Sequence, residues 1–213
     1  SDHFVFRSND STTEQFVGNL ALEQSAMSFS GRGDVSRYWS EKSLIMLLTV
    51  ASSLIPDKEF ALSVITGLPV QTYLGDPECR PRIKKALNGT HVFSINGQSR
   101  TVHVDVNRVI MEGAGAAIAY AACDGQLGVV DIGGRTTDLY VARGQKPLMH
   151  KCAGKALGVE VAGDLLSANF QREHGRPLTP LEVREILRSY VHSKALPSIM
   201  ARGKPVENLD TLV

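Results

Sequence analysis

The stretch VVDIGGRTTDLYVARG, residues 129–144, constrains the fold more than any other part of the chain. It contains an apolar run, an aspartate, two glycines, two threonines, a second aspartate and an alternating β-branched run. Alternation and β-branching predict strands near 127–132 and 137–142. The stretch therefore predicts a β-hairpin whose turn is made of small and hydroxylated residues between two acids.

We compared this hairpin with three kinds of phosphate-binding loop. A P-loop requires a GKS or GKT ending, which DIGGRTTD lacks. A dinucleotide fingerprint opens a helix, whereas the residues after Gly134 predict a strand. In a strand–turn–strand device, Gly133 and Gly134 let backbone N–H groups approach phosphate oxygens, and Thr136 and Thr137 add hydroxyl donors.

Asp131 stands at the predicted end of a buried strand. A carboxylate there is costly unless it is paired or serves a metal. Hydrated Mg²⁺ suits such a position, because magnesium keeps its waters and takes one or two carboxylates. The alternative interpretation is a glycine-rich hairpin with capping polar residues and no ligand.

The other segments predict an α/β chain. We expect a buried helix from Glu41 to Leu54, apolar nearly all round, and a buried strand over 60–70. A basic helix should then end near Leu87, followed by a hairpin around Asn96-Gly97.

Small residues predict a helix over 112–122, and a third strand is expected at PLMHKCAG, residues 147–154. An amphipathic helix over 158–175 should place Val161, Leu165 and Leu166 on one face. The last clear helix begins at a predicted capping box, with Thr179 as the cap, Pro180 at the first position and Glu182 completing the box.

Composition excludes few functional classes of protein. The net charge of +1 over 213 residues argues against direct nucleic-acid binding, and the basic run CRPRIKK is typical of a solvated helix face. The longest apolar run, residues 43–55, is too short to span a bilayer. The three cysteines lack the paired spacing of a disulfide framework or zinc site, as expected for a cytoplasmic protein.

Several segments, in order, resemble bacterial and archaeal actin-like proteins of the plasmid-segregation ParM/StbA type. VVDIGGRTTD is similar to the second phosphate loop of the actin superfamily, which also contains sugar kinases and heat-shock chaperones. The other segments are QFVGNLALEQS, VITGLPVQTYL, VHVDVNRVIMEGAGA and KALGVEVAGDLL. The resemblance covers about residues 16–190 and implies an actin-like, ribonuclease-H-like fold with mixed sheets flanked by helices.

The resemblance also implies roles for individual residues. Asp131 would hold a metal through water, with Asp138 supporting the turn or the water shell. Glu112 falls at the catalytic position and would orient the attacking water. The residues implied to line the nucleotide phosphates are Gly133, Gly134, Arg135, Thr136, Thr137 and Gly158, with Asp164 a weaker candidate.

Two positions depart from the family pattern. Met111 stands where family members commonly have proline before the catalytic position, which puts the role of Glu112 in question. Arg135 is longer than the small residues often found there, and it could reach a phosphate or point to solvent.

The resemblance also predicts an incomplete two-domain architecture. Neither the first phosphate hairpin nor the late glycine-rich adenosine motif has a counterpart in the sequence. We expect residues 1–40 to be part of the small subdomain of domain I, 41–124 its large subdomain, and 125–213 the first part of the large subdomain of domain II. As given, the chain is expected to bind ATP weakly and not to hydrolyse it.

The implied function is that of an actin-like ATPase that uses Mg²⁺ with ATP or GTP and couples hydrolysis to filament assembly, for plasmid segregation or intracellular positioning. Its partners would be other copies of itself and a DNA-binding adaptor protein. Two alternatives stay open: a non-polymerising ATPase such as a reactivating chaperone, and a nucleotide-free interaction scaffold.

Overall fold

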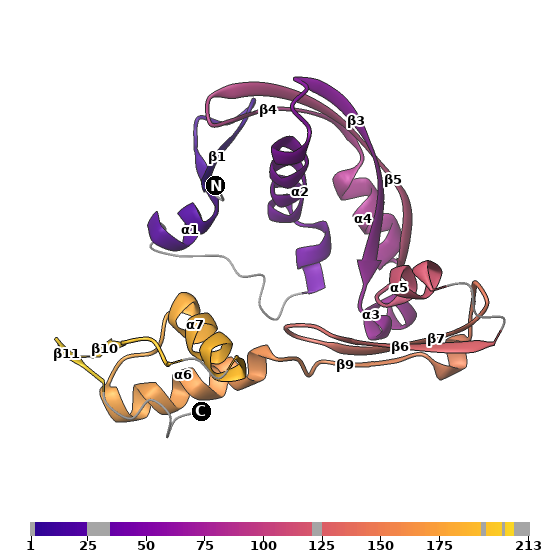
Figure 1. The fold of residues 1–213 in the computed structure, drawn as a ribbon. Helices are drawn as coiled ribbons and strands as arrows, with labels where there is room; N and C mark the ends of the chain where they lie inside the picture. The colour runs from indigo at the N-terminus through magenta and orange to yellow at the C-terminus, as the bar shows by residue number, and fades with distance from the viewer. Residues whose placement is uncertain (1–2, 25–34, 121–124, 193–194, 202, 207–213) are drawn as a thin grey trace. The chain divides into compact units, whose positions relative to one another are not determined.

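A computed structural model describes residues 3–24, 35–120, 125–192, 195–201 and 203–206. The chain divides into two compact units (Figure 1). The first unit consists of residues 1–129 and 139–153, and the second of residues 130–138 and 154–213. Strands and helices occur in both units, which confirms the predicted α/β class.

The first unit contains a five-stranded sheet with the order β2-β1-β4-β5-β3. Its strands are β1 His3–Ser8, β2 Gln15–Gly18, β3 Glu59–Leu68, β4 Gly89–Ile95 and β5 Gln98–Met111. β3 runs parallel to β5, whereas the β1–β2, β1–β4 and β4–β5 pairs are antiparallel. The predicted hairpin is confirmed, because Asn96 and Gly97 join β4 to β5 with φ angles of 50° and 77°.

The helices of this unit are α1 Asn19–Gln24, the 3₁₀ helix η1 Val35–Trp39, α2 Glu41–Leu54, α3 Val70–Gly75, α4 Cys79–Leu87 and α5 Ala114–Ala119. The predicted bounds of α2 and the predicted end of α4 are confirmed. The helix predicted over 112–122 begins later, at Ala114. Its predicted last residues, 121–122, lie outside the described residues.

The main core of the first unit lies between the sheet and helices α2 and α4, around which the sheet curves (Figure 1). Its most deeply buried members are Leu48, Leu68, Cys79, Ile83, Val102 and Val106. The strand predicted from Phe60 and expected to end at Gly67 and Pro69 is confirmed as β3, but the prediction that it is buried was wrong, since burial alternates along it. One face of β3 is open, so only every second residue meets the helices.

The apolar character of α2 nearly all round had suggested burial on more than one side, and this prediction was also wrong. Met46, Val50 and Leu54 are 58%, 58% and 77% exposed. They recur every four residues and form one outward stripe, while Ile45 and Leu48 enter the core.

Two described cysteines are buried free thiols, and Cys123 lies outside the described residues. The Cys79 thiol donates to Asp76 at 3.1 Å. Burial, with the neighbouring carboxylate, raises the pKa of Cys79 to about 11, so this thiol stays protonated and unreactive at neutral pH.

Within the described ranges, no helix is both long and apolar enough to cross a membrane.

A second sheet has the order β6-β7-β8, with β9 also paired to β7. Its strands are β6 Gln126–Ile132, β7 Thr137–Arg143, β8 Lys146–Pro147 and β9 Ala153–Lys155. The hairpin strands are confirmed, but the single third strand predicted over 147–154 is interrupted: its first residue belongs to β8 and its last two belong to β9. The amides of Lys151 and Cys152 fold back to the carbonyls of Leu148 and Met149, and this makes the 3₁₀ helix η2 Met149–Lys151.

The second unit carries a helix pair, α6 Glu160–His174 and α7 Pro180–Val191, with the short strands β10 Met200–Ala201 and β11 Lys204–Pro205. The capping box at the start of α7 is confirmed.

The predicted apolar face of α6 was wrong in two of its three members. Leu166 is buried, but Val161 and Leu165 are 41% and 62% exposed. The helices meet at Gly163, where a Cβ would lie only 2.7 Å from Val183 Cγ1. The buried row therefore runs through Gly163, Leu166 and Phe170.

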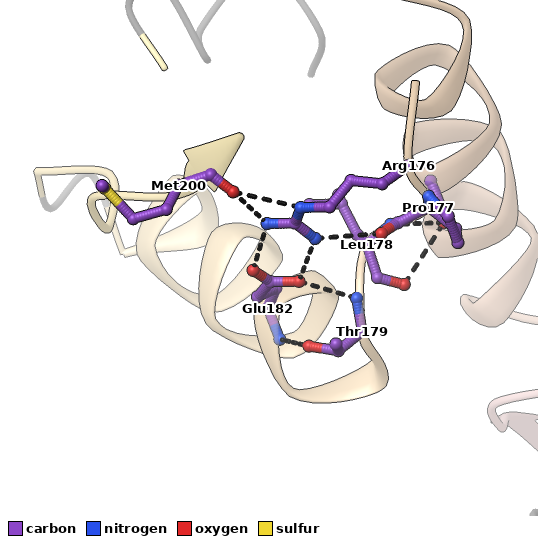
Figure 2. A network of polar contacts seen from close by, with 7 residues as sticks. Arg176, Pro177, Leu178, Thr179, Glu182 and Met200 are labelled. Atoms are coloured by element: carbon purple, nitrogen blue, oxygen red, sulfur yellow. Dashed lines mark hydrogen bonds and ion pairs between the residues drawn. The ribbon is translucent and has the colours of Figure 1, made fainter. Parts of the chain in front are cut away.

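Arg176, which follows the end of α6, donates hydrogen bonds to residues of α7 and β10 (Figure 2). Its guanidinium donates to both carboxylate oxygens of Glu182, at 2.7 and 3.0 Å, and its Nε donates to the carbonyl of Met200 at 3.0 Å. The backbone N–H of Thr179 donates to the same carboxylate at 2.7 Å. These hydrogen bonds lower the pKa of Glu182 to about 2, and those from Arg176 have the largest effect.

This network makes stability depend on pH in a defined window. The pKa of Glu182 is lowered in the folded state, so its contribution is complete above its ordinary pKa of 4.5 and disappears as pH falls towards about 2. We expect Glu182→Gln to cost about 1–2 kcal/mol at pH 7, because both side chains are partly solvated, and progressively less below pH 4.5. Urea unfolding across this range measures the difference.

Glu185→Gln is the matched control, since it makes the same change at an exposed position of the same helix. An equal effect of the two variants, or a loss that stays constant down to pH 3, would contradict the stabilising role of Glu182.

Candidate functional site

The turn between β6 and β7 is closed by a hydrogen bond from the Gly133 N–H to the Thr136 carbonyl at 2.8 Å. Between described residues, no hydrogen bond occupies the N–H groups of Gly134, Arg135 or Thr136. Successive unoccupied amides at a glycine turn can bind an anion. The turn therefore has the donors that phosphate recognition requires.

The start of α6 holds this turn in place. The backbone N–H of Val159 donates to the Gly133 carbonyl at 3.1 Å, and that of Glu160 donates to the Gly134 carbonyl at 2.7 Å. These bonds use amides that a helix N-terminus would otherwise leave unpaired. The first amides of α6 thus support the turn, and the amides of the turn itself remain for a ligand.

Gly158 makes this contact possible. A Cβ at this position would lie 2.4 Å from the Arg135 nitrogen and 2.4 Å from the carbonyl carbon and oxygen of Gly134. These are backbone atoms, which cannot move aside as a flexible side chain can. The structure therefore gives Gly158, predicted from the resemblance to lie near the nucleotide, a packing role beneath the turn.

Arg135 points to a carboxylate of α6. Its Nη1 lies 3.1 Å from Glu160 Oε2, and the two side chains are 29% and 41% exposed. Glu160 also lies against the turn, because a Cβ on Gly134 would be 2.8 Å from its Oε1. Sequence reasoning missed Glu160, although an acid in the first turn of a helix was its visible signal.

The two threonines have different surroundings. The Thr137 hydroxyl donates to the Leu157 carbonyl at 2.6 Å, so its proton supports the segment before α6. Thr136 supplies the carbonyl that closes the turn, and its Oγ1 would lie 3.9 Å from a Cβ on Gly133. Of the two, Thr136 is the better placed hydroxyl donor for a ligand at the turn.

The two aspartates of the hairpin differ in burial. Asp131 is exposed, because the end of β6 is open on both faces, so the desolvation argument for this carboxylate was wrong. Asp138, next to Thr137 on β7, is only 1% exposed. Among the described residues, no three histidine, cysteine, aspartate or glutamate side chains gather as a metal site. A single exposed carboxylate such as Asp131 still fits a hydrated Mg²⁺.

Glu112 belongs to the first unit, where it follows β5 directly. Its backbone N–H donates to the Leu68 carbonyl at 2.8 Å, which places it at the carboxyl ends of the parallel strands β3 and β5. Ligand sites of α/β folds gather at such ends. A Cβ on Gly67 would lie 3.4 Å from Glu112 Cγ, so this glycine of the neighbouring strand β3 leaves room for the Glu112 side chain.

Gly113 then turns the chain into α5. Its φ of 84° is left-handed, and a Cβ would lie 2.9 Å from the Cβ of Tyr140. Glu112 therefore stands before the helix, on a turn that only glycine can make without strain.

The structure gathers the turn residues 133–137 with Gly158 in the second unit. Asp138 lies in the same unit, and so does Asp164, an exposed residue of α6. The metal, phosphate-binding and catalytic roles predicted for these residues and for Glu112 stay predictions.

Comparison with solved structures shows the fold. The archaeal actin homologue Ta0583 matches 99% of this chain at 21% identity with a TM-score of 0.66. The non-polymerisable quadruple mutant of pCBH ParM matches 99% at 19% identity with a TM-score of 0.72. ParM from Bacillus thuringiensis, solved with AMPPNP, matches 99% at 17% identity with a TM-score of 0.59.

The chain spans 65% of the Ta0583 chain, 66% of pCBH ParM and 64% of Bacillus thuringiensis ParM. Ta0583 has also been solved in complex with ADP. A comparison with curated protein sequences gave no significant match.

The sequence model of one protein family, the N-terminal domain of actin-like proteins, matches residues 3–115. This range covers more than half of the chain and includes the whole five-stranded sheet. With an actin-like fold over nearly its full length and this domain over its first half, the chain belongs to the family of actin-like proteins.

Proposed function

We propose that the protein is an actin-like ATPase whose 133–137 turn binds the phosphates of ATP or GTP. The observation that carries the proposal is the glycine turn itself. Its carbonyls are fixed by the first amides of α6, and the N–H groups of residues 134–136 have no hydrogen bond to described residues. Relatives solved with ADP and AMPPNP support the same assignment.

In this proposal each residue has a distinct task. The amides of Gly134, Arg135 and Thr136 bind phosphate oxygens, and the Thr136 hydroxyl adds a donor. The Glu160 carboxylate keeps the Arg135 guanidinium beside the turn, where its positive charge offsets phosphate charge.

Asp131 would hold Mg²⁺ through water, and a bound magnesium ion would neutralise charge on the phosphates. Asp138 supports the turn from within β7. Glu112 accepts a hydrogen bond from the attacking water and orients it.

We further propose that nucleotide binding drives self-association into filaments, as the fold family suggests, with a DNA-binding adaptor as a second partner. Plasmid segregation or intracellular positioning would be the resulting role. A non-polymerising ATPase would show nucleotide turnover without assembly, and a nucleotide-free scaffold would show neither.

The full-length protein tests these alternatives. We expect isothermal titration to detect ATP or GTP binding that depends on Mg²⁺. Light scattering should rise above a threshold protein concentration only when nucleotide is present. Binding without any rise in scattering at high protein concentration would contradict filament assembly, and absence of binding would contradict the nucleotide site.

A further inference from the structure

Glu160 places a negative charge beside the turn that is proposed to bind phosphate. Its Oε2 lies 3.1 Å from Arg135 Nη1, and its Oε1 lies 2.8 Å from the position that a Cβ on Gly134 would take. The backbone of the same residue is bonded to the turn, because the Glu160 N–H donates to the Gly134 carbonyl at 2.7 Å. The carboxylate therefore belongs to the electrostatic surroundings of any ligand at the turn.

Covalent geometry limits the distance between this carboxylate and a bound phosphate. A Cβ lies about 2.5 Å from the nitrogen of its own residue, so Glu160 Oε1 is at most about 5.3 Å from the Gly134 nitrogen. A phosphate oxygen that accepts from this N–H at about 2.9 Å is then at most about 8 Å from the carboxylate. This is about one Debye length at physiological ionic strength, so salt screens the repulsion only in part.

Positive charge near the turn is limited to one side chain. Arg135 is the only lysine or arginine in residues 130–138 and 156–163, and it is paired with Glu160. Asp131, exposed at the end of β6, adds a further carboxylate to the same hairpin. The amides of the turn thus offer hydrogen bonds to phosphate without a net positive charge to balance it. A polyphosphate that carries its own cation is therefore favoured at this turn.

Glu160 also holds Arg135 beside the turn, but this contribution is the smaller of the two. The two side chains are 29% and 41% exposed, and exposed ion pairs contribute little. Repulsion, in contrast, acts on every charge of the ligand. Removing one carboxylate about 8 Å away should raise affinity about twofold for each unit of negative charge on the ligand.

We propose that Glu160 sets the charge selectivity of the turn, because it disfavours free polyphosphate and so makes binding depend on a divalent cation carried by the ligand. This inference rests on the proposed function, since it takes the 133–137 turn as the phosphate site. The backbone of Glu160 supports the turn, while its side chain restricts which form of the ligand binds.

Isothermal titration of the full-length protein with inorganic tripolyphosphate, in EDTA and again in excess Mg²⁺, tests the proposal without any contribution from a base. Glu160→Gln removes the charge and keeps a side-chain oxygen that accepts from Arg135. We expect this variant to bind metal-free tripolyphosphate about tenfold more tightly than wild type. Because Mg²⁺ removes two units of ligand charge, the preference for the Mg²⁺ complex should narrow about fourfold.

Glu173→Gln is the matched control. It makes the same change in net charge at an exposed position in the last turn of α6, about 20 Å along the helix from Glu160. That distance exceeds two Debye lengths, so affinity should stay within about twofold of wild type in both conditions. Arg135→Gln should act in the opposite direction and weaken the binding of metal-free tripolyphosphate most. Unfolding midpoints in urea check that all three variants fold.

Two different results would overturn the proposal. If wild type and all variants fail to bind tripolyphosphate in both conditions, the phosphate site itself is contradicted, and the role of Glu160 with it. If wild type binds but Glu160→Gln binds equally or more weakly in EDTA, the phosphate site stands, and Glu160 serves only to hold Arg135 beside the turn.

Discussion

Replacing Gly158 by alanine should disrupt the 133–137 turn more than the same change at Gly133, Gly134 or Gly163. The new Cβ would lie 2.4 Å from three backbone atoms of Gly134 and Arg135. Relief requires α6 to move away from the turn, which breaks the bonds from Val159 and Glu160. We expect a loss of about 2–3 kcal/mol in the free energy of unfolding of this unit, the usual scale for overpacking.

Urea unfolding measures this loss, and Gly128→Ala is the matched control. Gly128 lies on β6, and a Cβ there meets no atom within 4 Å. The same variant should weaken nucleotide binding by the full-length protein, since the amides of the turn lose their fixed arrangement. Equal stability of the two alanine variants would show that α6 does not pack on the turn as described.

Sequence signals predicted elements well where the signal is local. The Asn96-Gly97 turn, the capping box of Thr179 and Glu182, and the hairpin around Gly133 each depend on residues a few positions apart. The helix bounds at Glu41 and Leu54 are also set locally: the Ser40 side chain accepts a hydrogen bond from the Ser43 N–H, and Pro56 follows the end of the helix.

Burial was harder to predict, because it depends on contacts between segments distant in sequence. α6 turns Phe170 and Leu166 inward and leaves Leu165 in solvent, since α7 approaches it at Gly163. An apolar pattern alone could not show that Gly163 permits this approach.

The candidate site shows the same difference between features set by neighbouring residues and features set by contacts between distant segments. The glycines and threonines of the turn were evident from the sequence, but the packing role of Gly158 and the contact of Arg135 with Glu160 were not. Asp131 was expected to be buried but is exposed, and the burial of Asp138 was not predicted. Both differences arise because the two hairpin strands have different neighbours, which the local pattern does not record.

Replacing Glu112 by alanine should slow ATP hydrolysis by the full-length protein about 10²-fold or more, the scale of a positioned acid–base group. The fold should tolerate this change, because the main-chain bond from Glu112 N–H to the Leu68 carbonyl does not need the side chain. The left-handed turn that follows belongs to Gly113. Helix α5 begins only at Ala114, and its N-cap residue is Gly113 rather than Glu112.

Single-turnover hydrolysis and nucleotide affinity should be measured together, with Glu78→Ala as a control at an exposed acid of the same unit. A residue that acts on water should lower the rate and leave affinity within about twofold, because its contribution arises in the transition state. If affinity and rate fell by the same factor, Glu112 would serve to hold the nucleotide or the end of β5, and another group would have to orient the water. This distinction is therefore the decisive measurement for the proposed ATPase.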